Sequence, residues 1–186
     1  GKNFGAFTAS LPAASAKNLG AMWAIIGHSE ERRAKLQVMQ AYEPALQTDG
    51  ALRAKANAAV NTLVQAEVLN ALQDDLNVLL CVGETAEERG EGTLEEQKPR
   101  IEQVLKAQVS AGLRSLVDAG NGRDFVIGYE PVWAIGTGLT PTPQDVARMH
   151  GFARQRIDAL SPGKGASTRI LYGGSVKPEN ARELLH

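Results

Sequence analysis

Short runs of apolar residues alternate along the chain with longer segments in which apolar residues recur every three or four positions. The short runs are nearly continuous and rich in β-branched residues, which is typical of strands buried on both faces. The predicted strands are residues 22–26, 78–82, 125–129 and 169–172. The longer segments have the period of amphipathic helices. Two of them are marked by Val60, Leu63, Val64, Val68 and Leu72, and by Ile101, Val104, Leu105, Val109, Leu113 and Leu116.

The sequence contains the N-terminal capping signal of a third helix. Thr142 is the expected N-cap, Pro143 suits the first helical position, and Asp145 lies in the first turn. Apolar positions then follow at Val146, Met149, Ala153, Ile157 and Leu160. The alternation of strands and helices predicts right-handed crossovers and a parallel sheet, so the expected fold class is α/β.

Length and composition fit one ordinary domain, because the chain has 186 residues of which 43% are hydrophobic and 22% charged. A formal net charge of -1 provides no basic surface for nucleic acid or an anionic membrane. No apolar run approaches the roughly 20 residues of a spanning helix, and no signal-peptide pattern is present. Cys81 is the single cysteine, which excludes an internal disulfide and predicts a reducing, cytoplasmic location. Three scattered histidines make a Cys/His metal site improbable.

In parallel α/β folds the functional site lies at the carboxyl ends of the strands. The segments that follow the predicted strands are "GHSEERR", "GETAEERGEG", "EPVWAIGTG" and "GGSVKPEN". Each begins with a glycine or a polar residue that can face a ligand. These segments are therefore where catalytic and binding residues are expected.

The tripeptide "YEP" occurs twice, so Glu43 and Glu130 compete for a catalytic role. Glu130 closes an apolar strand and precedes Pro131 and a glycine-bearing loop that runs to Gly138. Abstraction of a proton next to a carbonyl needs a positioned base and a lid that expels water, and this arrangement offers both. Glu43 has no strand before it and no glycine loop after it, and Pro44 predicts the end of a helical turn. Glu130 is the favoured base.

Two further strand ends carry candidate groups. His28 follows "WAIIG" directly and is either an electrophile or acid-base group, or a polar cap on the strand end. Ser175 follows a diglycine turn and precedes a helix, which predicts a phosphate site or an ordinary turn. Gly136 can supply a further backbone amide to the same anion. Glu30 and Glu84 either orient a catalytic group or are structural ion-pair partners, and the structural role is favoured for both.

Five motifs in this chain, taken together and in order, closely resemble the triosephosphate isomerase family. They are "GAFTAS", "WAIIGHSE", "LLCVGET", "GYEPVWAIGTG" and "ILYGGSVKPEN". The resemblance implies a (β/α)8 TIM barrel, of which about four strands are identifiable, and an isomerase that acts on a phosphorylated triose without cofactor or metal.

The resemblance also implies roles for individual residues. The position of Glu130 matches the family's proton-transferring base, and His28 matches the neutral histidine that polarises the substrate oxygens. Gly136 and Ser175 match phosphate-binding positions. The hinge and lid correspond to a loop that begins with Pro131, Val132 and Trp133, and the latch of the closed lid corresponds to Tyr172. A homodimer through the loop at residues 5–10, with Thr8 near its tip, is implied as well.

The chain departs from the family pattern in three respects. A family barrel has about 250 residues, and the first strands, the last strand and the family's "N-x-K" lysine motif have no counterpart here. Either the sequence is a segment of a longer chain, or the missing strands come from elsewhere. "GHSEERR" has one glutamate more than the family's "GHSERR", and the span from Arg33 to Cys81, which contains Glu43, is longer than one barrel unit. The missing lysine leaves an alternative function, an inactive phosphate-binding or assembly module.

Overall fold

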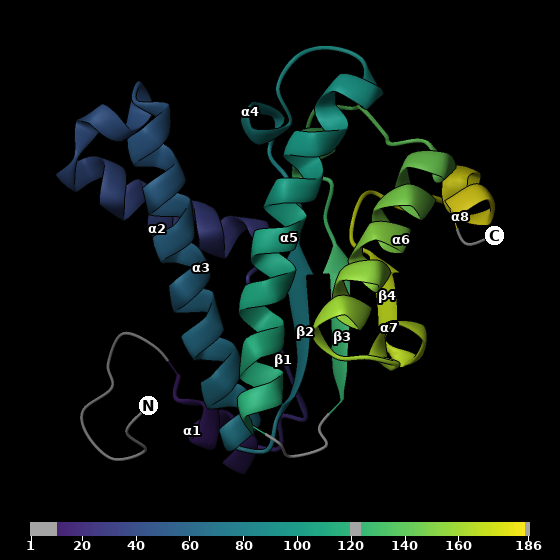
Figure 1. Cartoon of the computed structure of the whole chain (residues 1–186). Helices are drawn as coiled ribbons and strands as arrows, with labels where there is room; N and C mark the ends of the chain where they lie inside the picture. Colours follow the sequence, from purple (N-terminus) through teal and green to yellow (C-terminus); the bar gives the residue numbers. More distant parts are fainter. Residues whose placement is uncertain (1–10, 120–123, 185–186) are drawn as a thin grey trace. The chain divides into compact units, whose positions relative to one another are not determined.

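The computed structural model describes residues 11–119 and 124–184, in which helices and strands alternate (Figure 1). The four strands are β1 (Trp23–Ile26), β2 (Asn77–Val82), β3 (Phe125–Tyr129) and β4 (Arg169–Tyr172). The α-helices are α1 (Ala13–Asn18), α2 (Ser29–Tyr42), α3 (Gly50–Gln73), α4 (Ala86–Arg89), α5 (Leu94–Ala119), α6 (Pro143–Leu160), α7 (Lys164–Ser167) and α8 (Pro178–Leu184). Two short 3-10 helices are η1 (Pro44–Gln47) and η2 (Val132–Ala134). Each predicted strand is confirmed, with bounds that agree to within one residue.

The strands form one four-stranded sheet in the order β1-β2-β3-β4. β1 and β2 pair in parallel, with Trp23 opposite Asn77 and Ile26 opposite Leu80. Sequential strands are thus neighbours, and helical segments connect them, as the strand-helix alternation predicts. The α/β fold class is confirmed and is consistent with part of a TIM barrel.

The packing divides the chain into two compact units. The first unit comprises residues 1–80 and 111–126, and the second comprises residues 81–110 and 127–186. The division passes through β2, α5 and β3, so each unit contains a part of these three elements. Each unit is described by itself below.

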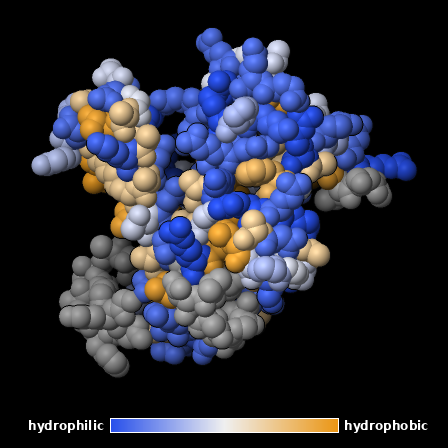
Figure 2. Space-filling model, in the orientation of Figure 1, coloured by the Kyte–Doolittle hydropathy of each residue, from blue (hydrophilic) through white to orange (hydrophobic). Residues whose placement is uncertain are grey.

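In the first unit α3 buries one stripe of its surface. Asp49 caps its N-terminus by accepting from the backbone N–H groups of Ala51 and Leu52. The buried side chains lie three or four residues apart, as the predicted amphipathic pattern requires; they are Ala56, Val60, Val64, Val68, Ala71 and Leu72. Leu63 was predicted on this stripe, but it is 44% exposed. The outer positions of α3 carry many alanines, and the surface over α2 and α3 accordingly shows apolar side chains among the charged ones (Figure 2).

In the second unit α6 begins as the sequence predicts. Thr142 accepts from the N–H of Asp145, and the Asp145 carboxylate accepts from the N–H of Thr142, so the two form a capping box. Four of the five predicted inner positions are buried, Val146, Met149, Ala153 and Ile157, whereas Leu160 in the last turn is only partly buried. The part of α5 that belongs to this unit buries Ile101, Leu105 and Val109 completely.

The prediction that all strands are buried on both faces is wrong for β1 and β4. On β1, Trp23 is 38% and Ile25 66% exposed, and on β4 Leu171 is 45% exposed. These strands are the first and the last in the sheet order, and alternate residues of a strand point to opposite faces. One face of β1 is therefore an apolar surface that the described residues leave open. Only β2 and β3 approach the expected burial.

Within residues 11–119 and 124–184, no helix is both long enough and apolar enough to cross a membrane.

A charged cluster joins α2 to α3 in the first unit. Lys35 on α2 pairs with Glu31 one turn earlier and with Glu67 on α3, at 3.0 Å from its nearer oxygen. Burial raises the pKa of Glu67, and the hydrogen-bonded Glu31 carboxyl raises it further, to about 7. Burial acts in the same direction on Glu31, but the hydrogen bonds to Glu67, Lys35 and Gly27 lower its pKa overall. Glu67 is thus the member of the pair that holds a proton.

We expect Glu67→Gln to change the pH dependence of stability. The folded chain keeps the Glu67 proton up to about pH 7, whereas the ordinary pKa of the unfolded group is 4.5. Its contribution to stability is complete below the lower value and is lost as the pH rises through the higher one. Glutamine mimics the protonated carboxyl at every pH. Relative to the native chain, the Tm of the variant should therefore rise between pH 5 and pH 8.

The Tm values can be followed by circular dichroism, with the exposed Glu179→Gln on α8 as the control. A Tm difference for Glu67→Gln that is constant across this pH range would contradict the assignment.

Candidate active site

The carboxyl ends of three strands meet in the second unit. The N–H of Glu130, just after β3, donates to the carbonyl of Val82 at the end of β2 over 2.8 Å. The N–H of Gly173, just after β4, donates to the carbonyl of Tyr129 over 2.7 Å. Glu130 is therefore held between the neighbouring strand ends and is only 5% exposed. Glu130 thus lies at the carboxyl ends of the strands, where functional sites of parallel α/β folds occur.

Glycines allow the backbone around Glu130 to pack this closely. A Cβ on Gly83 would lie 1.7 Å from the Glu130 carbonyl oxygen, which no side chain can do. A Cβ on Gly173 would lie 3.1 Å from Cγ of Glu130 and 3.3 Å from the Tyr129 carbonyl. The side chain of Gln108 fixes Gly83 by accepting from its N–H at 2.8 Å and donating to its carbonyl at 3.1 Å. The strand ends thus form a rigid frame around the carboxylate of Glu130.

Sequence reasoning did not single out Gln108 or the packing roles of Gly83 and Gly173. Gln108 is 6% exposed and lies beside the buried stripe of α5. Its signal in the sequence is a polar residue next to Val109 on an otherwise apolar face. A long-range partner 25 residues away cannot be inferred from that spacing.

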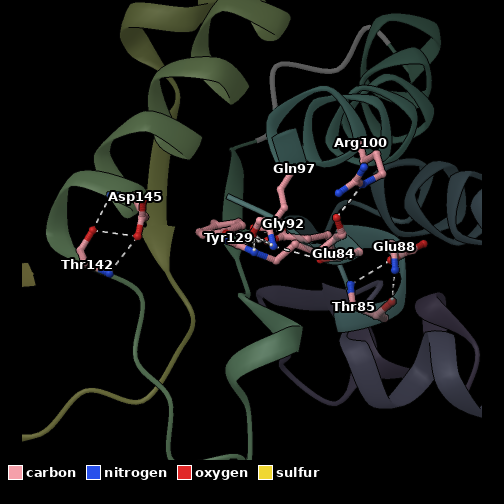
Figure 3. A network of polar contacts seen from close by, with 11 residues as sticks. Glu84, Thr85, Glu88, Gly92, Gln97, Arg100, Tyr129, Thr142 and Asp145 are labelled. Carbon is pink, nitrogen blue, oxygen red and sulfur yellow. Dashed lines mark hydrogen bonds and ion pairs between the residues drawn. The ribbon is translucent and has the colours of Figure 1, made fainter. Parts of the chain in front are cut away.

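Glu84, which lies just after β2, forms a buried ionic network. It is completely buried, pairs with Arg89 at 3.0 Å, and accepts from the Tyr129 hydroxyl at 3.3 Å (Figure 3). Burial raises the pKa of the Glu84 carboxyl, although Arg89 and Tyr129 oppose that rise. Burial and the nearby Glu84 charge in turn raise the pKa of Tyr129. The structural ion-pair role expected for Glu84 is confirmed, whereas Glu30 is exposed.

The start of the predicted lid is attached to this network. The N–H of Trp133 donates to the carbonyl of Glu84 over 3.2 Å, and the Arg89 guanidinium lies 4.2 Å from the centre of the Trp133 ring. Such a stacked cation contributes about 0.5–1 kcal/mol, and more where it is desolvated. Pro131 precedes η2, of which Val132 is the first residue, and the N–H of Ala134 donates to the carbonyl of Pro131. The residues predicted to form the hinge are therefore anchored.

The rest of the loop is exposed. Ile135 is 41% exposed, and Gly136 and Gly138 have φ values of +76° and +79°. A Cβ at either glycine would meet no atom within 4 Å, so glycine is favoured at these positions by its positive φ and not by a lack of space. Thr137 closes the turn by donating from its hydroxyl to the Ala134 carbonyl at 2.9 Å.

The predicted phosphate turn follows β4. Ser175 is exposed, and Asn180 ties its loop down by donating to the Ser175 carbonyl at 3.1 Å and accepting from Lys177 N–H at 2.7 Å. Tyr172, the predicted latch, is half-buried, and burial raises its pKa. A Cβ on Gly174 would lie 2.2 Å from its hydroxyl oxygen, so glycine is needed there for the tyrosine to occupy this position.

His28 lies in the first unit and is the N-cap of α2. Its Nδ1 accepts from the N–H of Glu30 at 3.4 Å, and in a neutral ring such a contact favours the tautomer with the proton on Nε2. The ring therefore caps a helix, and in that tautomer it also has an N–H donor. Glu130 lies in the second unit, so the two predicted catalytic residues belong to different units.

Glu43 lies between α2 and η1. It is exposed, ends α2, and caps η1 by accepting from the N–H of Ala45 at 3.1 Å. The loop at residues 5–10, to which the dimer prediction refers, lies outside the described residues, as does His186.

His150 on α6 is a polar group that the sequence did not associate with the strand ends. Its ring meets that of Tyr129 edge to face at 6.1 Å, and its Nε2 is buried without a hydrogen-bond partner among the described residues. Burial, and secondarily the charge of Arg154, lower its pKa, which favours the neutral imidazole. The search of the described residues finds no cluster of three or more His, Cys, Asp or Glu that could hold a metal ion.

Comparison with known proteins gives one consistent result. The family model described as "Triosephosphate isomerase" matches residues 1–186. Over 185 residues the chain is 40% identical to triosephosphate isomerase from Bradyrhizobium diazoefficiens, an alignment that covers 99% of this chain and 61% of that protein. It is 41% identical over 182 residues to the Rhodopseudomonas palustris enzyme of that name, with 97% and 59% covered. The chain thus spans about three fifths of the length of these curated relatives.

We expect Gly83→Ala to disrupt the frame around Glu130. The added Cβ overlaps a backbone carbonyl, which cannot rotate away as a side chain can. Overpacking typically costs about 1–3 kcal/mol, and a backbone clash should reach at least the upper end of that range. Urea denaturation measures the free energy of unfolding.

Gly151→Ala on α6 is the matched control, since its Cβ meets nothing within 4 Å. It should leave stability unchanged or raise it by up to about 1 kcal/mol, as glycine is unfavourable inside a helix. Equal free energies of unfolding for the two variants would show that the strand ends are not in close contact.

Proposed function

The chain belongs to the triosephosphate isomerase family, and from this we propose that it interconverts dihydroxyacetone phosphate and glyceraldehyde 3-phosphate. The observation that carries the proposal is the buried Glu130, held at the carboxyl end of β3 and followed by an anchored hinge and a glycine-bearing loop. A carboxylate in this setting has the rigid backbone and restricted water access that a general base for carbon acids needs.

In the proposed reaction Glu130 removes a proton from C1 of dihydroxyacetone phosphate and returns it to C2. As C1 loses its proton the carbonyl oxygen on C2 gains one, which gives an enediol. The C1 hydroxyl then loses its proton as C2 gains one, so the aldehyde forms without loss of atoms or electrons. His28, as the Nε2–H tautomer, would donate to the substrate oxygens and stabilise the charge that develops there. Because no electrons leave the substrate, this chemistry needs no redox cofactor.

The substrate phosphate is proposed to bind backbone amides near Gly136 and Ser175. Gly136 has a positive φ and no atom near its missing side chain, so its peptide is accessible. Asn180 stabilises the Ser175 loop. The loop that starts with Pro131, Val132 and Trp133 would close over the phosphate, and Tyr172 would hold it closed.

We further propose that strands outside residues 1–186 complete a single barrel domain and supply the family's lysine. The exposed Trp23 and Ile25 on one face of β1 support this, because an apolar strand face of this kind normally packs against further structure. The names of the relatives support an active enzyme over an inactive phosphate-binding or assembly module. A homodimer through residues 5–10 and a cytoplasmic location belong to the same proposal, the latter because Cys81 is the only cysteine.

We expect Glu130→Gln to lower kcat by roughly 100- to 10,000-fold, the range typical of a lost general base. The amide has nearly the same shape as the carboxyl group, so the thermal unfolding curve should stay close to that of the native chain. A coupled assay of triose phosphate isomerisation measures kcat.

Glu43→Gln is the control, since this exposed glutamate only caps η1. Its kcat should equal that of the native chain. Native turnover in Glu130→Gln, with the active chain verified by mass, would disprove the assignment of the base.

A further inference from the structure

The residue before His28 is held at both of its polar backbone atoms. Gly27 has a φ of +77° and connects β1 to α2. Its N–H donates to Oε2 of Glu31 at 2.7 Å, and its carbonyl accepts from Nε of Arg32 at 2.7 Å. Both partners are ionised side chains, and hydrogen bonds to charged groups are roughly twice as strong as those between neutral groups.

These two side chains are themselves fixed to the neighbouring helix α3. Arg32 donates from Nη1 to Oδ1 of Asn61 at 2.8 Å. Glu31 is paired with Lys35, which also contacts Glu67 at 3.0 Å. Both Gly27 contacts are partly buried, so water competes with them less than at an exposed site. The peptide groups on either side of Gly27 are therefore tied, through two charged side chains, to a second helix.

The His28 ring itself caps α2. Its contact with the N–H of Glu30 is 3.4 Å long, beyond the usual range of about 2.7–3.2 Å for such bonds. The direction in which the ring leaves the backbone depends on the peptide that joins Gly27 to His28. Because glycine has no Cβ, its intrinsic torsional preference is slight, and external contacts must fix it.

We propose that Glu31 and Arg32 are positioning residues for His28, which act by clamping Gly27. The inference rests on the proposed function, in which His28 polarises the substrate. It also gives a role to the additional acidic residue of "GHSEERR", because Glu31 at position i+4 and Arg32 at i+5 from Gly27 are the two residues that reach back to it.

The test compares two clamp variants and two controls by the 15N resonances of the imidazole rings, and a fifth variant assigns those resonances. The chain has three histidines, and His28→Asn identifies the His28 signals by their loss. Glu31→Ala and Arg32→Ala each remove one arm of the clamp. Glu30→Ala and Arg33→Ala remove the same charges from adjacent positions whose side chains do not contact Gly27.

In the native chain His28 should show one neutral tautomer, with the proton on Nε2. Both clamp variants should shift its two nitrogen resonances toward each other, as a ring that samples both tautomers does, while both controls keep the native pattern. Native tautomer ratios in folded Glu31→Ala and Arg32→Ala would overturn the proposal, as would equal changes in Glu31→Ala and Glu30→Ala.

A second measurement uses the unmodified chain, so it is independent of whether the variants fold. The amide proton of Gly27 should resonate downfield and exchange slowly with solvent, because it donates to a carboxylate. A resonance in the range of unfolded chains, or rapid exchange, would overturn the clamp.

Kinetics separate this inference from the proposed function. In the active isomerase, each clamp variant should lower kcat roughly ten- to a hundredfold with little change in KM, as misplacement of a catalytic group does. A clamp variant with native kcat would overturn the positioning role. Absence of isomerase activity in the native protein would disprove the proposed function, whereas the tautomer and exchange measurements would still decide whether Gly27 is clamped.

Discussion

The close approach of two strand ends is the constraint on which the candidate site depends. At the carboxyl ends of β2 and β3 the backbones come so near that the Glu130 carbonyl occupies the space of a Cβ on Gly83. Hydrogen bonds from Glu130 to Val82 and from Gly173 to Tyr129 fix the same region from both sides. The backbone that carries the Glu130 carboxylate is thus fixed by its contacts with the neighbouring strand ends.

The polar groups near these strand ends show how a charged side chain is stabilised in a buried position. Glu84 has no exposed surface, and burial of a carboxylate is costly unless a charge partner and hydrogen bonds compensate. Arg89 and the Tyr129 hydroxyl provide that compensation, and Arg89 also stacks on Trp133 in the loop after β3. One arginine thus connects the buried Glu84 to the start of a loop whose later residues are exposed.

A related device appears in the first unit, where charged side chains of a helix hold the turn that precedes it. Glu31 and Arg32 bind the backbone of Gly27, and Lys35 with Glu67 and Asn61 link them to α3. In the first unit glycine permits the turn through its positive φ, and in the second unit Gly83 permits the close approach of two strand ends because it has no Cβ. At Gly27 the freedom of glycine permits an unusual backbone torsion but does not select it, so the neighbouring polar side chains do.

The sequence by itself determined the four strands, the three long helical segments and the start of α6, and it favours Glu130 over Glu43 as the base, because these depend on local patterns. Apolar period, the Thr142–Asp145 capping signal and the context of each "YEP" all act within a few residues. Only the tertiary structure decided what lies beside those elements. The exposure of Ile25, the contact of Gln108 with Gly83 and the raised pKa of Glu67 arise between residues far apart in the chain. Local patterns cannot encode such partners, since burial and charge pairing depend on how the helices and strands pack together.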